Sequence, residues 1–313
     1  MDKYGEEYSG DSKFVADCRL LQSMYRVEIG EAIRPYKSRD GKTHYYGNYI
    51  EGGEESGKNF LTEHAFSYAK YRVENKQKHE TIESDRLFNN LLSSQSMAFN
   101  LFCPLQKLRS EAPQEATRAI QSALPHYDIA LVKEVALEFI PEKYKDITGD
   151  KSAMDAIIRY VDSEGKDCFT AIETKYSESL GANEAADKAT KEQERRVAVE
   201  LGIFRDEAAE KIASGDVPLT QIYRNFLLSE AYGNRYGLAS YSIILSPSIH
   251  PSTEREVDSL LPELKEEYAE KLRIVHLEDF VDALIANTPE EYSSLFDRFR
   301  SRYLDFDKAR KTL

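Results

Sequence analysis

The chain has no tryptophan, and its 313 residues include only three cysteines. Cys18, Cys103 and Cys168 are far apart and lack the close spacing of a cysteine metal site. Such an odd, sparse set is also unlike the disulfide framework of secreted proteins. We therefore expect reduced thiols in an intracellular protein located in the cytoplasm. The six histidines lack metal-ligand spacing, and neither a Gly-x-Ser-x-Gly elbow nor a Walker loop is present.

Long apolar runs are missing as well. No stretch approaches the roughly 18 apolar residues that cross a bilayer. The first residues, MDKYGEEYSGDSKF, lack the apolar segment of a secretory signal. The sequence therefore predicts no membrane partner. With 41% hydrophobic and 31% charged residues, its composition is that of a globular protein with a sizeable core.

Positive charge is in short supply. Lys and Arg number 42 and Asp and Glu number 55, which gives a net charge of −13. A protein that holds nucleic acid mainly by neutralising phosphates is basic on at least one face, and this chain can have only a local basic patch. The charge weighs against nucleic acid as a partner but does not exclude it, because bound metal ions supply positive charge where a phosphate lies.

Residues 1–80 are interpreted as a mainly helical accessory region ahead of the main domain, residues 81–313. The spacing of apolar residues predicts helices at 13–29 and 62–72, and the Gly- and Tyr-rich stretch between them is typical of loop or short strands. The charged run ENKQKHETIESD at 74–85 is the candidate linker, although a solvated surface loop explains it as well.

From residue 85 onward, apolar spacing and turn residues predict a regular order of elements. We expect helices at 85–104 and 113–124, strands at 132–140, 153–161 and 167–176, helices at 183–201 and 219–237, a strand at 238–246, a helix at 252–271, a short strand at 273–277, and helices from 278 and 289. The turn DSEGK between the second and third strands is of the kind that joins antiparallel strands. The order predicts an α/β fold with a mixed central sheet flanked by helices.

Strand alternation predicts a polar cluster. In 167–176, Glu173 and Lys175 share one face, because alternate side chains of a strand point to the same side. Asp155 lies near the start of the preceding strand, and in an antiparallel hairpin the start of one strand lies beside the end of the next. We therefore expect Asp155, Glu173 and Lys175 to form one cluster of two carboxylates and an ammonium at a strand end near solvent.

This cluster suits phosphodiester hydrolysis. Two carboxylates can hold Mg²⁺, or Mn²⁺ in its place, because hard cations prefer oxygen ligands. The backbone carbonyl of Thr174 is a further candidate ligand. Such a metal polarises a phosphoryl oxygen and acidifies a bound water, while Lys175 can position that water or stabilise charge on the phosphate. The alternative is a surface salt bridge, with Asp155 as a turn acid.

The segment MDAIIRYVDSEGKDCFTAIETKYSES, residues 154–179, resembles the core of PD-(D/E)XK nucleases, the restriction-endonuclease-like superfamily. The resemblance implies a core of helix, three strands, helix and strand over about residues 85–250. It also implies that Asp155 and Glu173 bind Mg²⁺ and that Lys175 assists the attacking water. Met154 stands where the nominal proline precedes the first acid, a position that is commonly relaxed.

Two further residues are candidates for this site. Glu138, on the first strand, can contribute to metal binding, or it is an exposed acid on an edge strand. Gln95, on the first helix, resembles the polar residue that some members of the superfamily place near the metal, and the alternative is a buried, hydrogen-bonded glutamine. The residues themselves do not decide between these interpretations.

A group of polar helix residues is a candidate for contact with nucleic acid. Lys188, Lys191 and Arg195 are spaced three and four apart and therefore share one helical face. That face can contact phosphates, although neighbouring acids make a solvated, salt-bridged face the alternative. Gln221 and Arg224 are a second candidate pair, or the polar edge of a packed helix.

The interpretation that we favour is a metal-dependent nuclease that hydrolyses phosphodiester bonds, with DNA favoured over RNA. One alternative is a catalytically idle nuclease-fold module that binds nucleic acid or protein, which the acidic charge favours. Another is a structural α/β protein with no nucleic-acid role. An intact Asp, Glu and Lys set favours the enzyme, because an idle site has no physical need for it. The sequence leaves open the recognition sequence, the oligomeric state and the choice between endonuclease and exonuclease.

Overall fold

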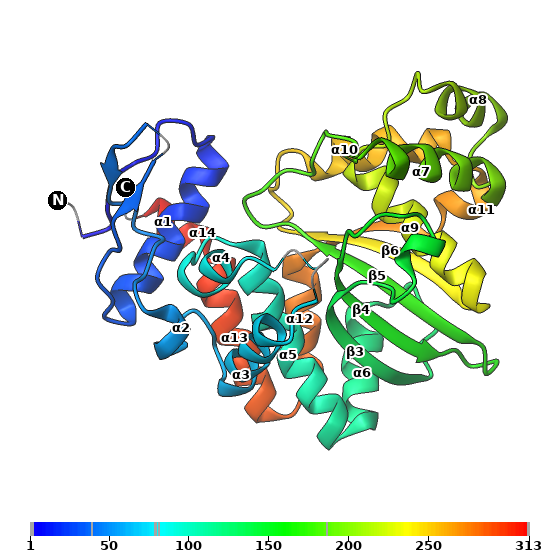
Figure 1. Ribbon diagram of the computed structural model, residues 1–313. Helices are drawn as coiled ribbons and strands as arrows, with labels where there is room; N and C mark the ends of the chain where they lie inside the picture. Colours follow the sequence, from blue (N-terminus) through cyan, green and yellow to red (C-terminus); the bar gives the residue numbers. More distant parts are fainter. Residues whose placement is uncertain (1–2, 39, 78–79, 81, 186, 312–313) are drawn as a thin grey trace.

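The computed structural model describes residues 3–38, 40–77, 80, 82–185 and 187–311. These residues form a five-stranded mixed sheet with helices on both faces, and a separate two-stranded ribbon near the N-terminus (Figure 1). The α/β fold expected from the sequence, with a mixed central sheet flanked by helices, is confirmed. None of the helices in the described residues is long and apolar enough to cross a membrane.

Seven strands and fourteen α-helices make up the regular structure of these residues. The strands are β1 (Tyr36–Lys37), β2 (Thr43–His44), β3 (Leu131–Phe139), β4 (Met154–Val161), β5 (Asp167–Thr174), β6 (Ala239–Ser246) and β7 (Leu272–His276). The helices are α1 (Lys13–Glu28), α2 (Gly53–Ser56), α3 (Glu63–Glu74), α4 (Ser84–Asn89), α5 (Ser94–Glu111), α6 (Pro113–Ala123), α7 (Lys188–Leu201), α8 (Asp206–Ser214), α9 (Gln221–Tyr236), α10 (Thr253–Leu260), α11 (Glu266–Ala269), α12 (Leu277–Asn287), α13 (Glu290–Tyr303) and α14 (Phe306–Arg310).

The five strands of the main sheet lie in the order β3-β4-β5-β6-β7. β4 runs antiparallel to both β3 and β5, whereas β6 is parallel to β5 and β7 is parallel to β6. The expected antiparallel hairpin of β4 and β5 is confirmed. Its turn contains Gly165 with φ of +83°, a left-handed conformation that glycine adopts without steric cost. The parallel connection from β5 to β6 runs through α7, α8 and α9, as such crossovers require.

Helices cover both faces of this sheet. α5, α6 and α12 cover one face, where Ile158, Tyr160 and Ile172 are buried in the larger core (Figure 1). α9 covers the other face, where Ile157 and Phe169 lie in a second core. Side chains of β4 and β5 therefore alternate between two apolar layers, and polar side chains can gather only near the strand ends.

The first helix packs against the last two, so that α1 lies beside α13 and α14 (Figure 1). Arg302 of α13 binds Gln22 of α1 and is buried, at 3% exposed. Its guanidinium donates to Gln22 Oε1 at 3.0 Å, to Asn59 Oδ1 at 2.6 Å and to the Asn59 carbonyl at 2.8 Å. The rings of Tyr25 and Tyr303 lie 4.1 and 4.6 Å from it. The division of the chain at residue 80 stays a prediction.

The helix expected at 85–104 is wrong in its extent, because the structure has two helices there, α4 and α5. The Ser93 hydroxyl accepts a hydrogen bond from the Gln95 N–H and caps the start of α5. Pro104 does not end α5, which continues to Glu111. An interior proline costs about 3 kcal/mol, and the burial of most of this central helix offsets that cost.

Two other helix predictions need correction, and one helix was not predicted. The helix expected at 252–271 is divided into α10, a 3-10 turn and α11. Pro262 lies in that turn, where it has no N–H to continue an α-helix. The charged helix α7 begins at Lys188 rather than at residue 183, and α8 was not predicted.

Replacing Arg302 with methionine should lower the free energy of unfolding by about 3 kcal/mol, because buried acceptors on Gln22 and Asn59 lose a charged donor. Urea unfolding of full-length protein measures the change. Arg298 lies on the same helix but is exposed, so Arg298→Met is the matched control and should stay within about 0.5 kcal/mol of wild type. Equal losses in the two variants would contradict this role of Arg302.

Candidate active site

Three carboxylates lie in one row across the sheet. Glu138 of β3 and Asp155 of β4 both lie between the pairs Leu137–Ala156 and Phe139–Met154, and Asp155 and Glu173 directly adjoin the pair Ala156–Ile172 at the end of the pairing of β4 with β5. Lys175 follows Glu173 by two residues, just beyond the end of β5. The three residues expected to form a cluster from strand alternation thus lie together, with Glu138 added on the neighbouring strand.

These side chains line one cavity with a volume of about 310 Å³. Its lining is mostly polar and comes from the strand ends, the starts of α5 and α9, and the segment before β4. The residues are Glu83, Arg86, Ser94, Gln95, Glu138, Ser152, Ala153, Asp155, Glu173, Lys175, Gln221 and Asn225. Such a lining suits an ionic ligand better than an apolar one.

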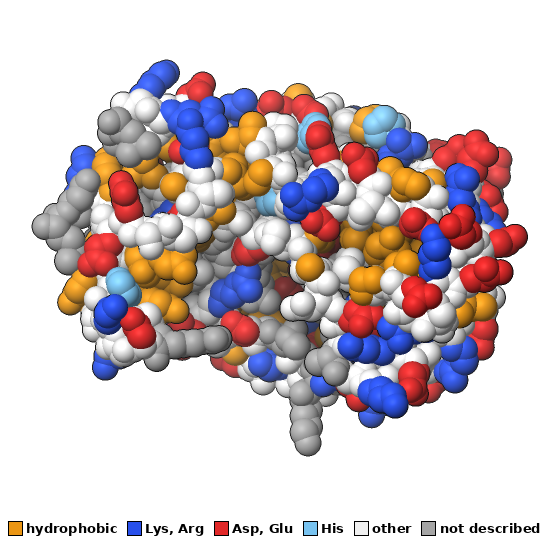
Figure 2. Space-filling view, turned by 90° about the horizontal axis from the view of Figure 1, so that it is seen from above, with side chains coloured by type: hydrophobic (Ala, Val, Ile, Leu, Met, Phe, Trp, Pro, Cys, Tyr) orange, Lys and Arg blue, Asp and Glu red, His pale blue; other side chains and the backbone are white. Residues whose placement is uncertain are grey.

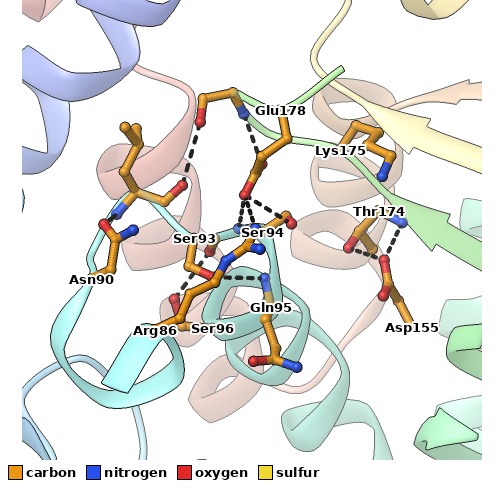
Figure 3. A network of polar contacts seen from close by, with 12 residues as sticks. Arg86, Asn90, Ser93, Ser94, Gln95, Ser96, Asp155, Thr174, Lys175 and Glu178 are labelled. Carbon is orange, nitrogen blue, oxygen red and sulfur yellow. Dashed lines mark hydrogen bonds and ion pairs between the residues drawn. The ribbon is translucent and has the colours of Figure 1, made fainter. Parts of the chain in front are cut away.

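Asp155 is hydrogen-bonded to the strand beside it. Its Oδ2 atom accepts from both the backbone N–H and the hydroxyl of Thr174, each at 2.7 Å (Figure 3). Burial, together with the carboxylates of Glu173 and Glu138, raises the pKa of Asp155 well above its usual range. The Thr174 N–H and the ammonium of Lys175 oppose this rise in pKa without cancelling it.

Glu173 is surrounded by donors. Lys175 Nζ lies 2.6 Å from its Oε1 atom. Gln221 Nε2 donates to the same oxygen at 2.9 Å, and Asn225 Nδ2 donates to Oε2 at 2.9 Å. Gln221 begins α9 and Asn225 lies one turn later on the same face, so the start of this helix presents two amides to one carboxylate.

Lys175 is buried together with its partner, and the side chains of Lys175 and Glu173 are each 8% exposed. This burial contradicts the expectation of a strand end near solvent, because the start of α9 covers it. Burial acts to lower the pKa of Lys175, but the carboxylates of Glu173 and Asp155 outweigh it and raise that pKa. Lys175 is therefore a protonated ammonium at neutral pH.

Glu138 departs from regular strand geometry. Its φ of +50° lies in the left-handed region, which non-glycine residues rarely adopt, and strain of this kind gathers at functional sites. Its side chain is 6% exposed and accepts a hydrogen bond from Gln95 Nε2 at 2.9 Å. Burial raises the pKa of Glu138, and the charge of Glu173 adds to that rise. Gln95 is half-buried, hydrogen-bonded and part of the cavity lining, and its place near a metal stays a prediction.

The donor chemistry of the cavity fits a hard divalent cation. Its carboxylates offer oxygen ligands, and burial together with the neighbouring carboxylates raises the pKa values of Asp155 and Glu138, a cost that a cation reduces. As placed, the described residues form no group of three or more His, Cys, Asp or Glu side chains that could hold a metal ion. Both oxygens of Glu173 have protein donors, so this carboxylate must exchange a donor to bind an ion, whereas the hydrogen bonds from Thr174 to Asp155 all go to Oδ2.

A second polar network borders the cavity at the start of α5. Glu178 accepts hydrogen bonds from the Ser94 N–H at 3.1 Å and the Ser94 hydroxyl at 3.2 Å, and it forms an ion pair with Arg86. Figure 3 shows this group facing Asp155, Thr174 and Lys175 across the site. Burial acts to raise the pKa of Glu178, but Arg86 and the Ser94 N–H outweigh it and lower that pKa.

The proposed phosphate-binding face of α7 is largely occupied by ion pairs. Lys191 Nζ and Arg195 Nη2 lie 3.1 and 2.7 Å from the two carboxylate oxygens of Glu184. Lys188 is exposed and lies 3.7 Å from Glu192. Figure 2 shows one face of the molecule, on which acidic and basic side chains are interspersed without a broad basic region. The charges on the α7 face and on the molecular face in Figure 2 do not by themselves favour the binding of a long phosphate backbone.

Arg224 belongs to a buried network beside the cavity. Its guanidinium donates to Asp150 Oδ2 at 2.7 and 2.9 Å, to Ser152 Oγ at 2.9 Å and to Glu194 Oε1 at 3.2 Å. Burial and the carboxylate of Asp150 raise the pKa of Glu194 to about 8, although Arg224 opposes the rise. Of the pair expected to touch nucleic acid, Gln221 thus supports Glu173 and Arg224 supports the segment before β4.

Some residues of the site were not anticipated. Asn225 follows Gln221 by four residues, and this spacing could have identified it, since such residues share a helical face. Arg86 and Glu178 are 92 residues apart in the sequence. Contacts between residues so far apart cannot be predicted from a local sequence pattern.

Comparison with known protein families finds a match for nearly the whole chain. A family model described as the PD-(D/E)XK nuclease superfamily matches residues 9–305. No curated protein and no solved structure matches the chain. The region matched includes every residue of the cavity.

The buried pair of Glu173 and Lys175 should show coupling in unfolding experiments. Lys175→Met should lower the free energy of unfolding by about 1–3 kcal/mol, because Glu173 keeps its charge without its cation. Glu173→Gln in the same chain should restore part of that loss. Denaturant unfolding of the single and double variants measures this coupling. Strictly additive losses would contradict it.

The raised pKa of Glu194 predicts a loss of stability as the pH rises. Its folded pKa of about 8 exceeds the usual value of 4.5, so the folded protein binds the proton more tightly than the unfolded chain does. The free energy of unfolding should therefore fall between about pH 5 and pH 8. Glu194→Gln should remove this component, whereas Glu192→Gln, on the exposed side of α7, should retain it. Melting curves across this range measure the difference, and parallel curves for all three proteins would contradict it.

Proposed function

Because the chain belongs to the PD-(D/E)XK nuclease superfamily, we propose that it is a metal-dependent nuclease that hydrolyses phosphodiester bonds in DNA. The observation that carries the proposal is the meeting of Asp155, Glu173 and Lys175 in one polar cavity. Two carboxylates and a protonated lysine are the set that such hydrolysis needs.

Asp155 and Glu173 are the proposed ligands of Mg²⁺, with Mn²⁺ as an ion that can replace it. Glu138 and the backbone carbonyl of Thr174 are additional proposed ligands. When bound, the ion polarises a phosphoryl oxygen and makes a water ligand more acidic. Gln95 orients Glu138 through its hydrogen bond of 2.9 Å. Gln221 and Asn225 hold Glu173 in the same way from α9.

Lys175 is proposed as the catalytic lysine. Since nearby carboxylates raise its pKa, it carries a proton at neutral pH. An ammonium in this state donates hydrogen bonds, so it can hold the attacking water in line or stabilise negative charge on the phosphate. It does not act as the base while Glu173 and Asp155 remain charged beside it.

Contacts with the DNA strand are proposed for Arg86 at the cavity and for the cations of α7. Arg86 has a side chain 41% exposed while it pairs with Glu178. Lys188 has a side chain 90% exposed, and Lys191 and Arg195 are partly exposed beside it. In this proposal Gln221 and Arg224 do not contact the DNA strand directly. Gln221 positions Glu173, and Arg224 positions the segment before β4.

The second candidate function is an idle nuclease-fold module that binds nucleic acid or protein. The observation that favours it is the engagement of Glu173 by three protein donors. A carboxylate held in this way is stable without a metal. The two functions differ in what Mg²⁺ does to the protein, and that difference is measurable.

Thermal melts and cleavage assays on the same samples test the proposal. Mg²⁺ or Mn²⁺ should raise the melting temperature of wild type by an amount that grows with its concentration, because the ion binds only the folded state. Asp155→Ala should lose this shift. Asp167→Ala, on the same hairpin with its side chain 54% exposed, should keep it. Cleavage of plasmid and single-stranded DNA should fall by about a hundredfold or more in Asp155→Ala and Lys175→Ala.

Two outcomes would overturn the proposal. An equal metal-induced shift in wild type and Asp155→Ala would mean that the ion binds elsewhere. Wild type that cleaves neither DNA nor RNA with either ion would leave the idle module as the function.

A further inference from the structure

A cluster of aromatic rings surrounds a second, larger cavity at the N-terminal ribbon. The cavity has a volume of about 1080 Å³, and its lining includes Tyr8, Tyr36, His44, Tyr46 and Tyr49. Sites for small ligands commonly span roughly 300–1,000 Å³, so this hollow is large enough for more than one planar ring. Nothing in the proposed chemistry of the active site uses these residues.

The rings form two stacks, each of which begins on an arginine. In the first, the Arg34 guanidinium lies 5.4 Å from the ring centroid of Tyr49, and Tyr49 stacks on Tyr36 at 5.3 Å and 17°. In the second, Arg19 lies 5.4 Å from Tyr46, and Tyr46 stacks on His44 at 5.1 Å and 7°. In each stack, the first ring, Tyr49 or Tyr46, therefore already has a cation packed against it.

The outer members of the two stacks are neighbours. Tyr36 and His44 are cross-strand partners in the β1–β2 ribbon. Tyr36 is 37% exposed, and the His44 side chain is 29% exposed. Among the described residues, Tyr49 is stacked on Tyr36 and Tyr46 lies against it at a tilt of 46°, and no other ring or cation is stacked on it. The ribbon thus offers two adjacent flat rings, held rigid from behind, to a planar ligand.

We propose that Tyr36 and His44 form a stacking platform for unpaired bases of a nucleic-acid strand. Stacking on an aromatic side chain contributes without regard to sequence, because every base has a π-face. Bases in a duplex are already stacked on each other, so the platform selects single-stranded segments. As a description of the substrate, this inference rests on the proposed function.

The charges around the platform suit a base with a short piece of backbone. Lys37 and Lys42 are exposed on the ribbon and can meet phosphates. Glu6, whose Oε2 atom lies 3.2 Å from His44 Nδ1, and Glu7 line the same cavity, and their carboxylates can accept hydrogen bonds from the amino groups of bases. Among the described residues, the charged side chains that line the cavity are acidic at Glu6, Glu7 and Asp40 and basic at Arg19 and Lys42, so stacking dominates the binding and the affinity depends only weakly on salt.

One helix connects the platform to the active-site cavity. Asp85, in the first turn of α4, pairs with Arg34 at the base of the first stack, with Nη2 and Oδ2 at 2.9 Å. Arg86, the next residue, lines the active-site cavity and pairs with Glu178. The platform and the active-site cavity are thereby both in contact with α4.

Binding is measured by fluorescence anisotropy with full-length protein and a labelled thymidine oligonucleotide of about fifteen nucleotides. EDTA is present throughout, so that neither metal binding nor cleavage affects the result. Wild type should bind this strand more tightly than a blunt duplex. Tyr36→Ala should weaken binding by about tenfold, ~1.4 kcal/mol, whereas Tyr36→Phe should retain it. An oligonucleotide of the same length made of abasic sites should bind no better to wild type than to Tyr36→Ala.

Tyr71→Ala is the matched control, because Tyr71 is a 57% exposed tyrosine on α3, outside the cavity. It should bind like wild type. His44→Ala is the second variant and should weaken binding even if Tyr36→Ala fails to fold, which melting curves reveal. The platform proposal would be overturned if Tyr71→Ala weakened oligonucleotide binding as much as Tyr36→Ala does, or if wild type preferred the duplex. It would also be overturned if the protein bound a trimethyl-lysine peptide in place of the oligonucleotide.

A parallel cleavage assay with Mg²⁺ separates this inference from the proposed function. If oligonucleotide binding depends on Tyr36 but the protein has no cleavage activity, the platform is supported and the proposed nuclease function is rejected. Cleavage of single-stranded DNA at the wild-type rate and affinity by Tyr36→Ala would support the nuclease and remove the platform.

Discussion

Repulsion among three carboxylates in one row of the sheet is the constraint to which the other polar groups of the site respond. Glu138, Asp155 and Glu173 come from adjacent strands, so the sheet itself forces them together. Lys175 and two amides of α9 offset the charge of Glu173, the Thr174 N–H and hydroxyl offset that of Asp155, and Gln95 binds Glu138. Burial, together with the neighbouring carboxylates, still raises the pKa values of Asp155 and Glu138. A cation therefore fits the site on electrostatic grounds alone.

The compensation depends on helices that cover opposite faces of the sheet. α5 brings Gln95 to the row at its N-terminal turn, and α9 brings Gln221 and Asn225 at its own. Both helices need their apolar sides buried to stay in place, and these sides belong to different cores. The geometry of the carboxylates is thus supported by packing on both sides, which is how a rigid scaffold holds groups that repel one another.

Much of this site could be predicted because it depends on local rules. Alternation in β4 and β5 and the hairpin between them are enough to bring Asp155, Glu173 and Lys175 together. The burial of these residues could not be predicted, because it comes from α9, which lies far along the chain. The left-handed backbone of Glu138 leaves no trace in periodicity. The division of α4 from α5 was missed because apolar residues continue across it, and only the cap at Ser93 marks the boundary.

The contact between Gln22 and Arg302 has a consequence for how the protein is made. The two residues are separated by 280 positions, and Arg302 also closes on Asn59. A ribosome produces α1 and Asn59 early, but the Arg302 guanidinium that binds Gln22 and Asn59 is made only after all strands of the sheet. Loops closed over such distances form slowly. Helix α1 therefore cannot form its contact with Arg302 until the end of synthesis. A chain that ends before residue 302 lacks the buried arginine that binds Gln22 and Asn59.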